Sequence, residues 1–353
     1  MHPILQGMHP VRLLALETAV PPNRVGRDDA RTLARCVFGE TLAGYGALDR
    51  VFETSTVEQR WLARPLDWYQ AGHGWSDRAA AFEAVAVALL AEAAGRALAA
   101  AGVAPGAVDH VICVSTTGFA APSLDARLIG PLGLRADVGR TPVFGWGCAG
   151  GALGLARAAD LARAAPGRTV LLLVVELCSL AFRSDPDPVN VIGCALFGDG
   201  AAAALLRADG LEGVAVTDSA EHTWPDSLDV MGWRVDDAGF GLELRRDLPE
   251  FLSGRLRPVV DAFLAQHGVA ITDLDGVVGH PGGPKVLDAM TVALDLAPDA
   301  FDGSREVLAR FGNASAAGVL MVLQRALAAG ARGRHLMLAL GPGFTAGLNL
   351  MDL

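Results

Sequence analysis

Short apolar runs alternate with longer amphipathic stretches along this chain, a pattern typical of α/β proteins. Three apolar runs of strand length occur at residues 11–16, 109–114 and 169–175. Residues 78–101 have the apolar spacing of a long helix, and Gly102 directly after them is a helix stop. Residues 28–77 are more polar and predict helix, interrupted by loops at Gly39 and around Tyr45. Strands separated by helices predict a layered α/β fold with a largely buried sheet.

The two halves of the sequence repeat one pattern. Gly102-Val103-Ala104 recurs 166 positions later as Gly268-Val269-Ala270, and each tripeptide leads through an aspartate into an apolar strand. The helix that opens at Cys148 has a counterpart that opens at Asn313, 165 positions later. Such self-similarity indicates a duplicated unit, with one copy in residues 1–206 and the other in residues 207–353. A pseudo-twofold axis between the copies would bring the two helix starts towards one central site.

A cysteine among glycines marks the start of the first repeated helix. In Gly147-Cys148-Ala149-Gly150-Gly151 the thiol would lie at a helix N-terminus, where unpaired backbone N–H groups favour the thiolate. The glycines leave room for a substrate carbonyl beside the sulfur. On this motif alone, a buried structural cysteine is the alternative.

Two polar residues of the second copy complete a candidate catalytic set. His280 follows a predicted strand in Gly279-His280-Pro281-Gly282-Gly283-Pro284, and reactive groups gather at strand ends in α/β sheets. Taken singly, His280 fits a structural role and Asn313 fits an N-cap. With Cys148 as nucleophile, however, the two side chains would supply neutral donors to one oxyanion. No carboxylate is placed to orient His280 as in a hydrolytic triad, so the set favours acyl transfer and carbon–carbon bond formation over hydrolysis.

Composition narrows the class of protein further. The 353 residues are 52% hydrophobic with a net charge of −10, which argues against a nucleic-acid binder and suits an apolar subunit interface. Every basic residue except Lys285 is arginine. The five cysteines include no CxxC pair and no cluster at metal spacing, so we expect a reducing compartment and no metal site. We also expect no signal peptide, no membrane insertion and a cytoplasmic location.

Taken together, the motifs resemble those of type III polyketide synthases, the chalcone synthase-like branch of the thiolase superfamily. The resemblance covers nearly all of residues 11–353. Five segments carry it: Gly147-Cys148-Ala149-Gly150-Gly151, Leu196-Phe197-Gly198-Asp199-Gly200, Gly279-His280-Pro281-Gly282-Gly283-Pro284, Gly312-Asn313-Ala314-Ser315 and Gly341-Pro342-Gly343-Phe344. It implies a thiolase-like duplicated αβαβα layered fold and a homodimer. It also implies that Cys148 takes an acyl group from CoA, and that His280 and Asn313 stabilise the enolate formed when malonyl-CoA loses CO2. No metal or redox cofactor is implied.

The same resemblance assigns further residues to the substrate cavity and to the CoA path. Phe197 matches a phenylalanine that guards the junction between them, and Leu242 falls near a second one. A glycine that controls cavity length corresponds to Gly232, or to Trp233 if the register shifts by one, and the two predict opposite cavity sizes. Other cavity positions are Cys178 and Ala181, which replace threonines of plant members, together with Ser315 and Gly343. The CoA-binding positions are Arg50, Gly283 and Lys285, although solvated surface charge is the alternative for Arg50 and Lys285.

The apolar cavity positions favour an aliphatic starter such as a fatty acyl-CoA, extended with malonyl-CoA and cyclised to an alkylpyrone or alkylresorcinol. The spelling of the cysteine motif resembles bacterial alkylresorcinol and alkylpyrone synthases more than naphthalene-forming ones. Three alternatives stay open: a ketoacyl synthase III that condenses once, a naphthalene-forming type III synthase, and a silent lipid-binding homologue. The first usually has glutamine and alanine after its histidine, where this chain has Pro281 and Gly282.

Overall fold

A computed structural model describes residues 10–44, 49–181, 183, 185, 187–209, 213–236, 239–245 and 247–353, without the side chains of residues 40–44. The loop expected around Tyr45 lies outside this part of the chain. The strands are β1 (Val11–Ala19), β2 (Asn23–Gly26), β3 (Gln59–Leu62), β4 (Val108–Ser115), β5 (Gly139–Phe144), β6 (Thr169–Leu177), β7 (Asp199–Ala208), β8 (Ala215–Thr223), β9 (Met231–Asp236), β10 (Gly239–Leu244), β11 (Gly276–Gly279), β12 (Arg334–Gly341) and β13 (Thr345–Asp352).

The helices lie between these strands in chain order. They are α1 (Arg27–Gly44), α3 (Val51–Thr54), α4 (Leu66–Gln70), α5 (Trp75–Ala101), α6 (Leu124–Leu132), α7 (Gly150–Ala164), α8 (Cys178–Ala181), α9 (Pro188–Leu196), α10 (Leu248–Leu252), α11 (Leu256–Ala265), α12 (Pro284–Leu294), α13 (Asp302–Phe311) and α14 (Ser315–Ala328). The described residues also include the 3-10 turns η2 (Pro105–Ala107), η3 (Gly147–Ala149) and η4 (Ile271–Asp273).

The strand pairing confirms the duplication. Nine strands form one sheet in the order β11-β12-β13-β8-β1-β7-β6-β4-β5. In the first half β4 runs parallel to β6, β6 antiparallel to β7, and β7 antiparallel to β1. In the second half β11, β12, β13 and β8 repeat these relationships in the same sequence. Within the sheet, β1 of the first half pairs with β8 of the second half at Val11 and Arg12. Residue 206, the predicted end of the first copy, lies near the end of β7.

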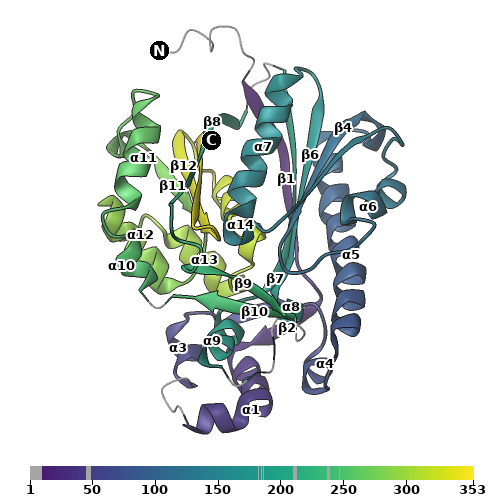
Figure 1. Cartoon of the computed structure of the whole chain (residues 1–353). Helices are drawn as coiled ribbons and strands as arrows, with labels where there is room; N and C mark the ends of the chain where they lie inside the picture. Colours follow the sequence, from purple (N-terminus) through teal and green to yellow (C-terminus); the bar gives the residue numbers. More distant parts are fainter. Residues whose placement is uncertain are drawn as a thin grey trace.

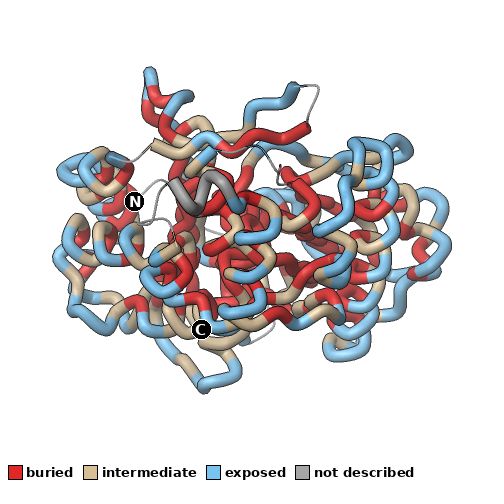
Figure 2. The backbone as a smooth tube through the Cα atoms, turned by 90° about the horizontal axis from the view of Figure 1, so that it is seen from below, coloured by how far each residue is buried: buried red, intermediate tan, exposed pale blue. Residues whose placement is uncertain are grey.

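Helices and sheet stack in five layers (Figure 1). From one side to the other these are α11 with α12, the second half of the sheet, α7 with α14, the first half of the sheet, and α5 with α6. All nine residues of β6 are buried, because helices cover both faces of the sheet there. Figure 2 shows the same arrangement as buried chain through the middle of the molecule and exposed chain around it. The predicted αβαβα fold is confirmed.

The central helices α7 and α14 cross at small residues. A Cβ atom at Gly151 would lie 2.2 Å from the backbone oxygen of Ala316, closer than atoms can approach. Only glycine at this position lets the two backbones come so near each other. The close crossing brings the N-termini of the two repeated helices together.

Helix α5 is longer than predicted, since it begins at Trp75. By length and hydropathy alone it could cross a membrane. Its apolar side, including Phe82, Leu89 and Leu90, is buried against β1, β6 and β7, as expected of a core helix in a layered fold.

The segment from residue 28 to residue 77 differs from the prediction of interrupted helix. Residues 59–62 form β3, which pairs with β2, because their side chains alternate between partly exposed and buried positions. The expected break near Gly39 is present as a kink, where Phe38 leaves helical geometry within α1.

Candidate active site

Cys148 lies in η3, directly before α7, and not within the helix proper. The Gly147 φ angle is +47°, and a Cβ atom there would lie 2.6 Å from the Pro342 side chain. Gly341 has as little room, since its Cβ would lie 2.5 Å from the Ala149 nitrogen. The cysteine turn of the first half therefore packs tightly against the Gly-Pro-Gly turn of the second.

Backbone contacts hold Asn313 beside the residue expected to guard the cavity. The Asn313 N–H donates to the Leu196 carbonyl at 2.9 Å, and the Gly198 N–H donates to the Asn313 carbonyl at 3.0 Å. The side-chain oxygen of Asn313 accepts from the Ser315 N–H at 2.8 Å, and its Nδ2 donates to the Gly282 carbonyl at 3.1 Å. These contacts fix the amide orientation and leave one N–H of Nδ2 for the site.

Ser315 connects the two halves of the site. Its φ angle is +46°, in the left-handed region that a residue with a side chain seldom adopts. Its hydroxyl lies 3.8 Å from the Cys148 sulfur and 3.5 Å from Glu176 Oε1. Strained backbone of this kind collects at functional sites, where the surrounding contacts hold it in place.

His280 lies at the end of β11, as predicted. Its N–H donates to the Leu338 carbonyl, and its ring packs 3.4 Å from the Cβ position of Gly318, one turn into α14 from Ser315. Neither ring nitrogen has a hydrogen-bond partner within the described chain. Burial lowers the pKa of His280 to about 3, so the imidazole is neutral and has one N–H to donate.

The resting state of Cys148 differs from the prediction. Burial raises the pKa of its thiol to about 12, while hydrogen bonds from Ser315 and Asn313 oppose that rise only partly. The negative charge of Glu176 adds to the rise. The expected preference for a thiolate is therefore wrong for the free site, because loss of water outweighs the favourable position before a helix.

Glu176 is a residue of the site that sequence reasoning missed. Its carboxylate ends the buried strand β6 and accepts from the Thr116 and Thr117 N–H groups and from the Thr117 hydroxyl, at 3.1, 3.0 and 2.7 Å. Burial raises its pKa to about 7. The available signal was a lone carboxylate at the end of an otherwise apolar strand, since such a group is seldom buried without a partner.

Several expected cavity residues lie in α8 and in the paired strands β9 and β10. Cys178 and Ala181 are buried in α8, next to Glu176 in sequence. Trp233 pairs with Leu242 across β9 and β10, and its ring centroid lies 6.4 Å from that of Phe197. Gly232 instead pairs with the exposed Glu243, and its Cβ position meets open space. Of the two alternatives, the geometry therefore places Trp233 and not Gly232 beside Phe197.

The expected CoA residues are more dispersed. Arg50 precedes α3 and Lys285 lies in the first turn of α12, and both side chains are exposed. Gly283 has a φ angle of +149° and lies against Leu196, so it is tied to the Asn313 segment. Gly343 has a φ angle of +121° in the turn between β12 and β13. No group of three or more metal-ligating side chains occurs among the described residues.

The cysteine, the neutral imidazole and the oriented carboxamide thus all lie against the first turn of α14, in a duplicated αβαβα fold. This fold and this site define a condensing enzyme of the thiolase type, one that forms carbon–carbon bonds.

Comparison with known proteins gives the family. Residues 6–210 match the N-terminal domain of chalcone and stilbene synthases, and residues 215–352 match the C-terminal domain of that family. The chain therefore belongs to the chalcone and stilbene synthase family and is a type III polyketide synthase.

The relatives are named for different activities. The chain is 40% identical to a 1,3,6,8-tetrahydroxynaphthalene synthase of Streptomyces peucetius subsp. caesius, over 94% of this chain and 90% of that protein. It is 30% identical to the alpha-pyrone synthesis polyketide synthase-like Pks18 of Mycobacterium tuberculosis, over 96% and 90%. The solved structure of the tetrahydroxynaphthalene synthase from Streptomyces coelicolor A3(2) superimposes with a TM-score of 0.91 at 31% identity, covering 96% of this chain and 98% of that one.

Proposed function

We propose that this protein condenses malonyl-CoA repeatedly onto an aliphatic acyl-CoA starter and cyclises the product to an alkylpyrone or alkylresorcinol. The observation that carries the proposal is the contact at 3.8 Å between the Cys148 sulfur and Ser315, next to the oriented Asn313 amide and the neutral His280 ring. The site has a nucleophile and two neutral donors, which is what acyl transfer followed by condensation requires.

The priming step needs a proton transfer within the site. Because both groups are neutral at rest, the Cys148 proton passes to His280 as the sulfur attacks the acyl-CoA carbonyl. The carbonyl carbon–sulfur bond to CoA then breaks, and the departing CoA thiolate takes the proton back from His280. The acyl group is left on Cys148, and the imidazole is neutral again.

The extension step uses the same neutral donors. The malonyl thioester oxygen accepts hydrogen bonds from the N–H groups of His280 and Asn313. These hydrogen bonds stabilise the enolate that forms when CO2 is lost. The enolate carbon attacks the acyl carbonyl on Cys148, the carbon–sulfur bond breaks, and the chain grows by two carbons as a CoA thioester. The thiolate released from Cys148 accepts the next acyl group. No step requires a metal or a redox cofactor.

The surroundings of the site support an aliphatic starter. Cys178 and Ala181 are buried and offer no hydroxyl group. The ring centroid of Trp233 lies 6.4 Å from that of Phe197 and 6.1 Å from that of Phe240, so the three rings form an aromatic cluster. Apolar side chains of this kind favour hydrocarbon starters over polar ones, because the apolar surface of the starter is removed from water when it binds against them.

A second product is supported by a separate observation. The relative at 40% identity is a tetrahydroxynaphthalene synthase, whose named product has no alkyl chain. Mass spectrometry of products made from malonyl-CoA with deuterated octanoyl-CoA separates the candidates. We expect products that keep the deuterated chain. A naphthalene product without deuterium would establish the second candidate, and a single condensation would indicate a ketoacyl synthase III activity.

Substitution of Cys148 tests the mechanism. We expect Cys148→Ala to reduce polyketide formation at least a thousandfold, because no acyl-enzyme can form. Cys148→Gln, with a carbonyl in place of the thioester, should still release CO2 from malonyl-CoA. Intact-mass analysis should show an acyl adduct on the wild-type protein and none on either variant. Full polyketide output from Cys148→Ala would show that the nucleophile is another residue.

We further propose a homodimer in the cytoplasm, with acyl-CoA and malonyl-CoA as substrates. Strand β5 lies at the edge of the nine-stranded sheet, and most of its residues are exposed. Phe119 and Phe144 are each more than half exposed, and their rings meet edge to face near this strand. An exposed strand edge beside aromatic side chains is suited to pairing with a second copy.

A further inference from the structure

A series of hydrogen bonds joins three side chains next to α8 that take no part in the proposed mechanism. The Tyr69 hydroxyl lies 2.6 Å from the Ser179 hydroxyl, which in turn donates to the fully buried carboxylate of Asp199. That carboxylate also accepts from the Ser179 N–H at 2.8 Å and from the Ala63 N–H at 2.6 Å. We refer to Tyr69, Ser179 and Asp199 together as the α8 anchor.

The direction of these hydrogen bonds follows from the charge of Asp199. Burial raises the pKa of its carboxyl to about 6, and its three hydrogen bonds oppose that rise, so at neutral pH the group is ionised and only accepts. The Ser179 hydroxyl therefore donates to Asp199 and accepts from the Tyr69 hydroxyl. Removal of the Ser179 hydroxyl breaks the connection between the other two and takes one donor from a buried carboxylate.

Asp199 is itself held in place by the sheet. It begins β7 and pairs with Leu177, the last residue of β6, and the Gly198 N–H just before it donates to the Asn313 carbonyl. Helix α8 starts directly after Leu177 and has only four residues, so its own backbone hydrogen bonds are few. The α8 anchor thus connects a short helix to a strand whose position relative to the site is fixed.

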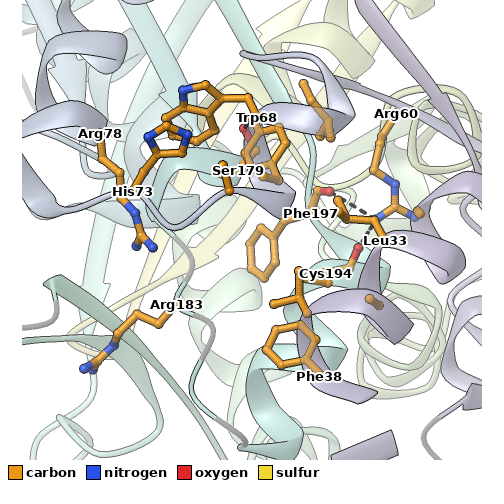
Figure 3. Close-up of a pocket in the computed structure, with 16 residues that line it drawn as sticks. Leu33, Phe38, Arg60, Trp68, His73, Arg78, Ser179, Arg183, Cys194 and Phe197 are labelled. Carbon is orange, nitrogen blue, oxygen red and sulfur yellow. Dashed lines mark hydrogen bonds between the residues drawn. The ribbon is translucent and has the colours of Figure 1, made fainter.

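One side of α8 borders empty space. A pocket of about 100 Å³ lies among α1, α4 and α9, and Ser179 is the residue of α8 that lines it, together with Tyr69 and Phe197 (Figure 3). Cys178 and Ala181, the α8 residues expected at the substrate cavity, are buried and do not line this pocket. Because an empty volume offers no atoms to pack against, the hydrogen bonds of the anchor are what oppose a shift of α8 into it.

We propose that the α8 anchor fixes the number of malonyl-CoA extensions, because it holds the α8 wall of the substrate cavity in one position relative to Cys148. The inference rests on the proposed function, and Tyr69, Ser179 and Asp199 are positioning residues that act through α8. A displacement of about 1 Å in a positioning element can change a rate by a factor on the order of a hundred. A mobile α8 would therefore let chain release compete after fewer or more extensions.

Two variants of the same shape test the anchor. Ser179→Thr keeps the hydroxyl and adds a methyl group beside the pocket, whereas Ser179→Val has the same outline without the hydroxyl. Octanoyl-CoA and malonyl-CoA are supplied, and the main product is compared with products one extension shorter or longer. We expect that ratio to change less than twofold in Ser179→Thr and to fall at least fivefold in Ser179→Val, with Tyr69→Phe changing in the same direction. Equal ratios for Ser179→Thr and Ser179→Val would overturn the proposal.

Hydrogen exchange measures the mobility of α8 without turnover. We expect the peptide that contains α8 to exchange at least fivefold faster in Ser179→Val than in Ser179→Thr. Ser219→Ala on β8, which removes a serine hydrogen bond of 2.7 Å to Asn349, is the control for loss of stability alone and should change neither α8 exchange nor the product ratio. Unchanged exchange in Ser179→Val would overturn the inference and leave the proposed function intact. A wild-type protein that makes no product with more than one extension would overturn both.

Discussion

Three titratable side chains at the site lie in the protein interior, and burial moves each pKa towards the neutral form. The effect raises the pKa of Cys148 and Glu176 and lowers that of His280. At rest the cysteine and the imidazole are therefore both neutral. The same neutrality makes the stability of the protein depend on pH.

We expect Glu176 to reduce stability as the pH rises through about 4.5 to 7. In this window the native carboxyl, with its raised pKa, stays protonated while the unfolded one ionises, so the native state holds more protons and the free energy of unfolding falls. His280 acts oppositely, because its lowered pKa reduces stability as the pH falls from about 6.5 to 3.

Glu176→Gln should therefore reduce the fall in the free energy of unfolding that accompanies a rise in pH. Urea denaturation at about pH 5 and pH 7.5 gives the free energy of unfolding at each pH. Its decrease between the two should be smaller in the variant than in the wild type by about 1 to 3 kcal/mol. The control is Glu92→Gln, which removes an exposed carboxylate paired with Arg96. Equal slopes for Glu176→Gln and the wild type would show that the carboxyl is ionised throughout this range.

At the scale of helices and strands, two packing arrangements position the site. One is the crossing of α7 with α14 at Gly151, and the other is the end of α9, where three backbone carbonyls face the buried Arg60. The first sets the separation of the two repeated helix starts. The second fixes the segment from Leu196 to Gly198, which pairs with Asn313.

Gly151→Ala tests the helix crossing. Its methyl group would overlap the Ala316 carbonyl oxygen, so we expect a loss of about 2 to 4 kcal/mol in the free energy of unfolding. Gly95→Ala on α5 is the matched control, because no atom lies within 4 Å of its Cβ position. That change should stabilise the protein by about 0.5 to 1 kcal/mol through helix propensity. Similar values for the two variants would contradict the close crossing.

Substitution of Arg60 tests how the end of α9 is held in place. Arg60→Met leaves the carbonyls of Cys194 and Ala195 without their donor in a buried setting, and we expect a loss of about 2 to 4 kcal/mol with a lower kcat. Arg60→Lys keeps a cation and should recover part of both quantities. If Arg60→Met folded and turned over like the wild type, the guanidinium would not hold the Asn313 segment.

At the scale of the whole molecule, the described chain leaves an edge of the nine-stranded sheet and an aromatic surface beside it uncovered. Strand β5 pairs with β4 and ends the sheet, and Phe119 and Phe144 extend the exposed surface beside it. The other edge of the sheet, at β11, packs against α13 and α14. This asymmetry favours association through the β5 side.

Charges on the aromatic surface test the dimer. Sedimentation equilibrium should give twice the chain mass for the wild type and a single chain mass for a Phe119→Glu, Phe144→Glu double variant, because the charges would be buried at the interface. Val292→Glu, at an exposed position on α12, should stay dimeric. A wild-type monomer, or a dimer in the double variant, would assign the interface elsewhere.

The sequence by itself determined the duplication and the layered fold, and it indicated the three residues whose catalytic roles we propose. Apolar periodicity follows burial, Cys148 and His280 each follow an apolar run, and glycine-bounded motifs mark Cys148, His280 and Asn313. The same local reasoning failed for the thiolate, since a pKa depends on how much water the completed fold removes from the sulfur.

Only the tertiary structure decided which distant groups meet. Glu176 became part of the site through Ser315, which lies 139 positions away. Trp233 rather than Gly232 reached Phe197 because strand register determines which face a side chain occupies. A pocket of about 100 Å³ lined by Phe197 lies among α1, α4 and α9, and an empty volume is a property of the packed helices that no single segment encodes.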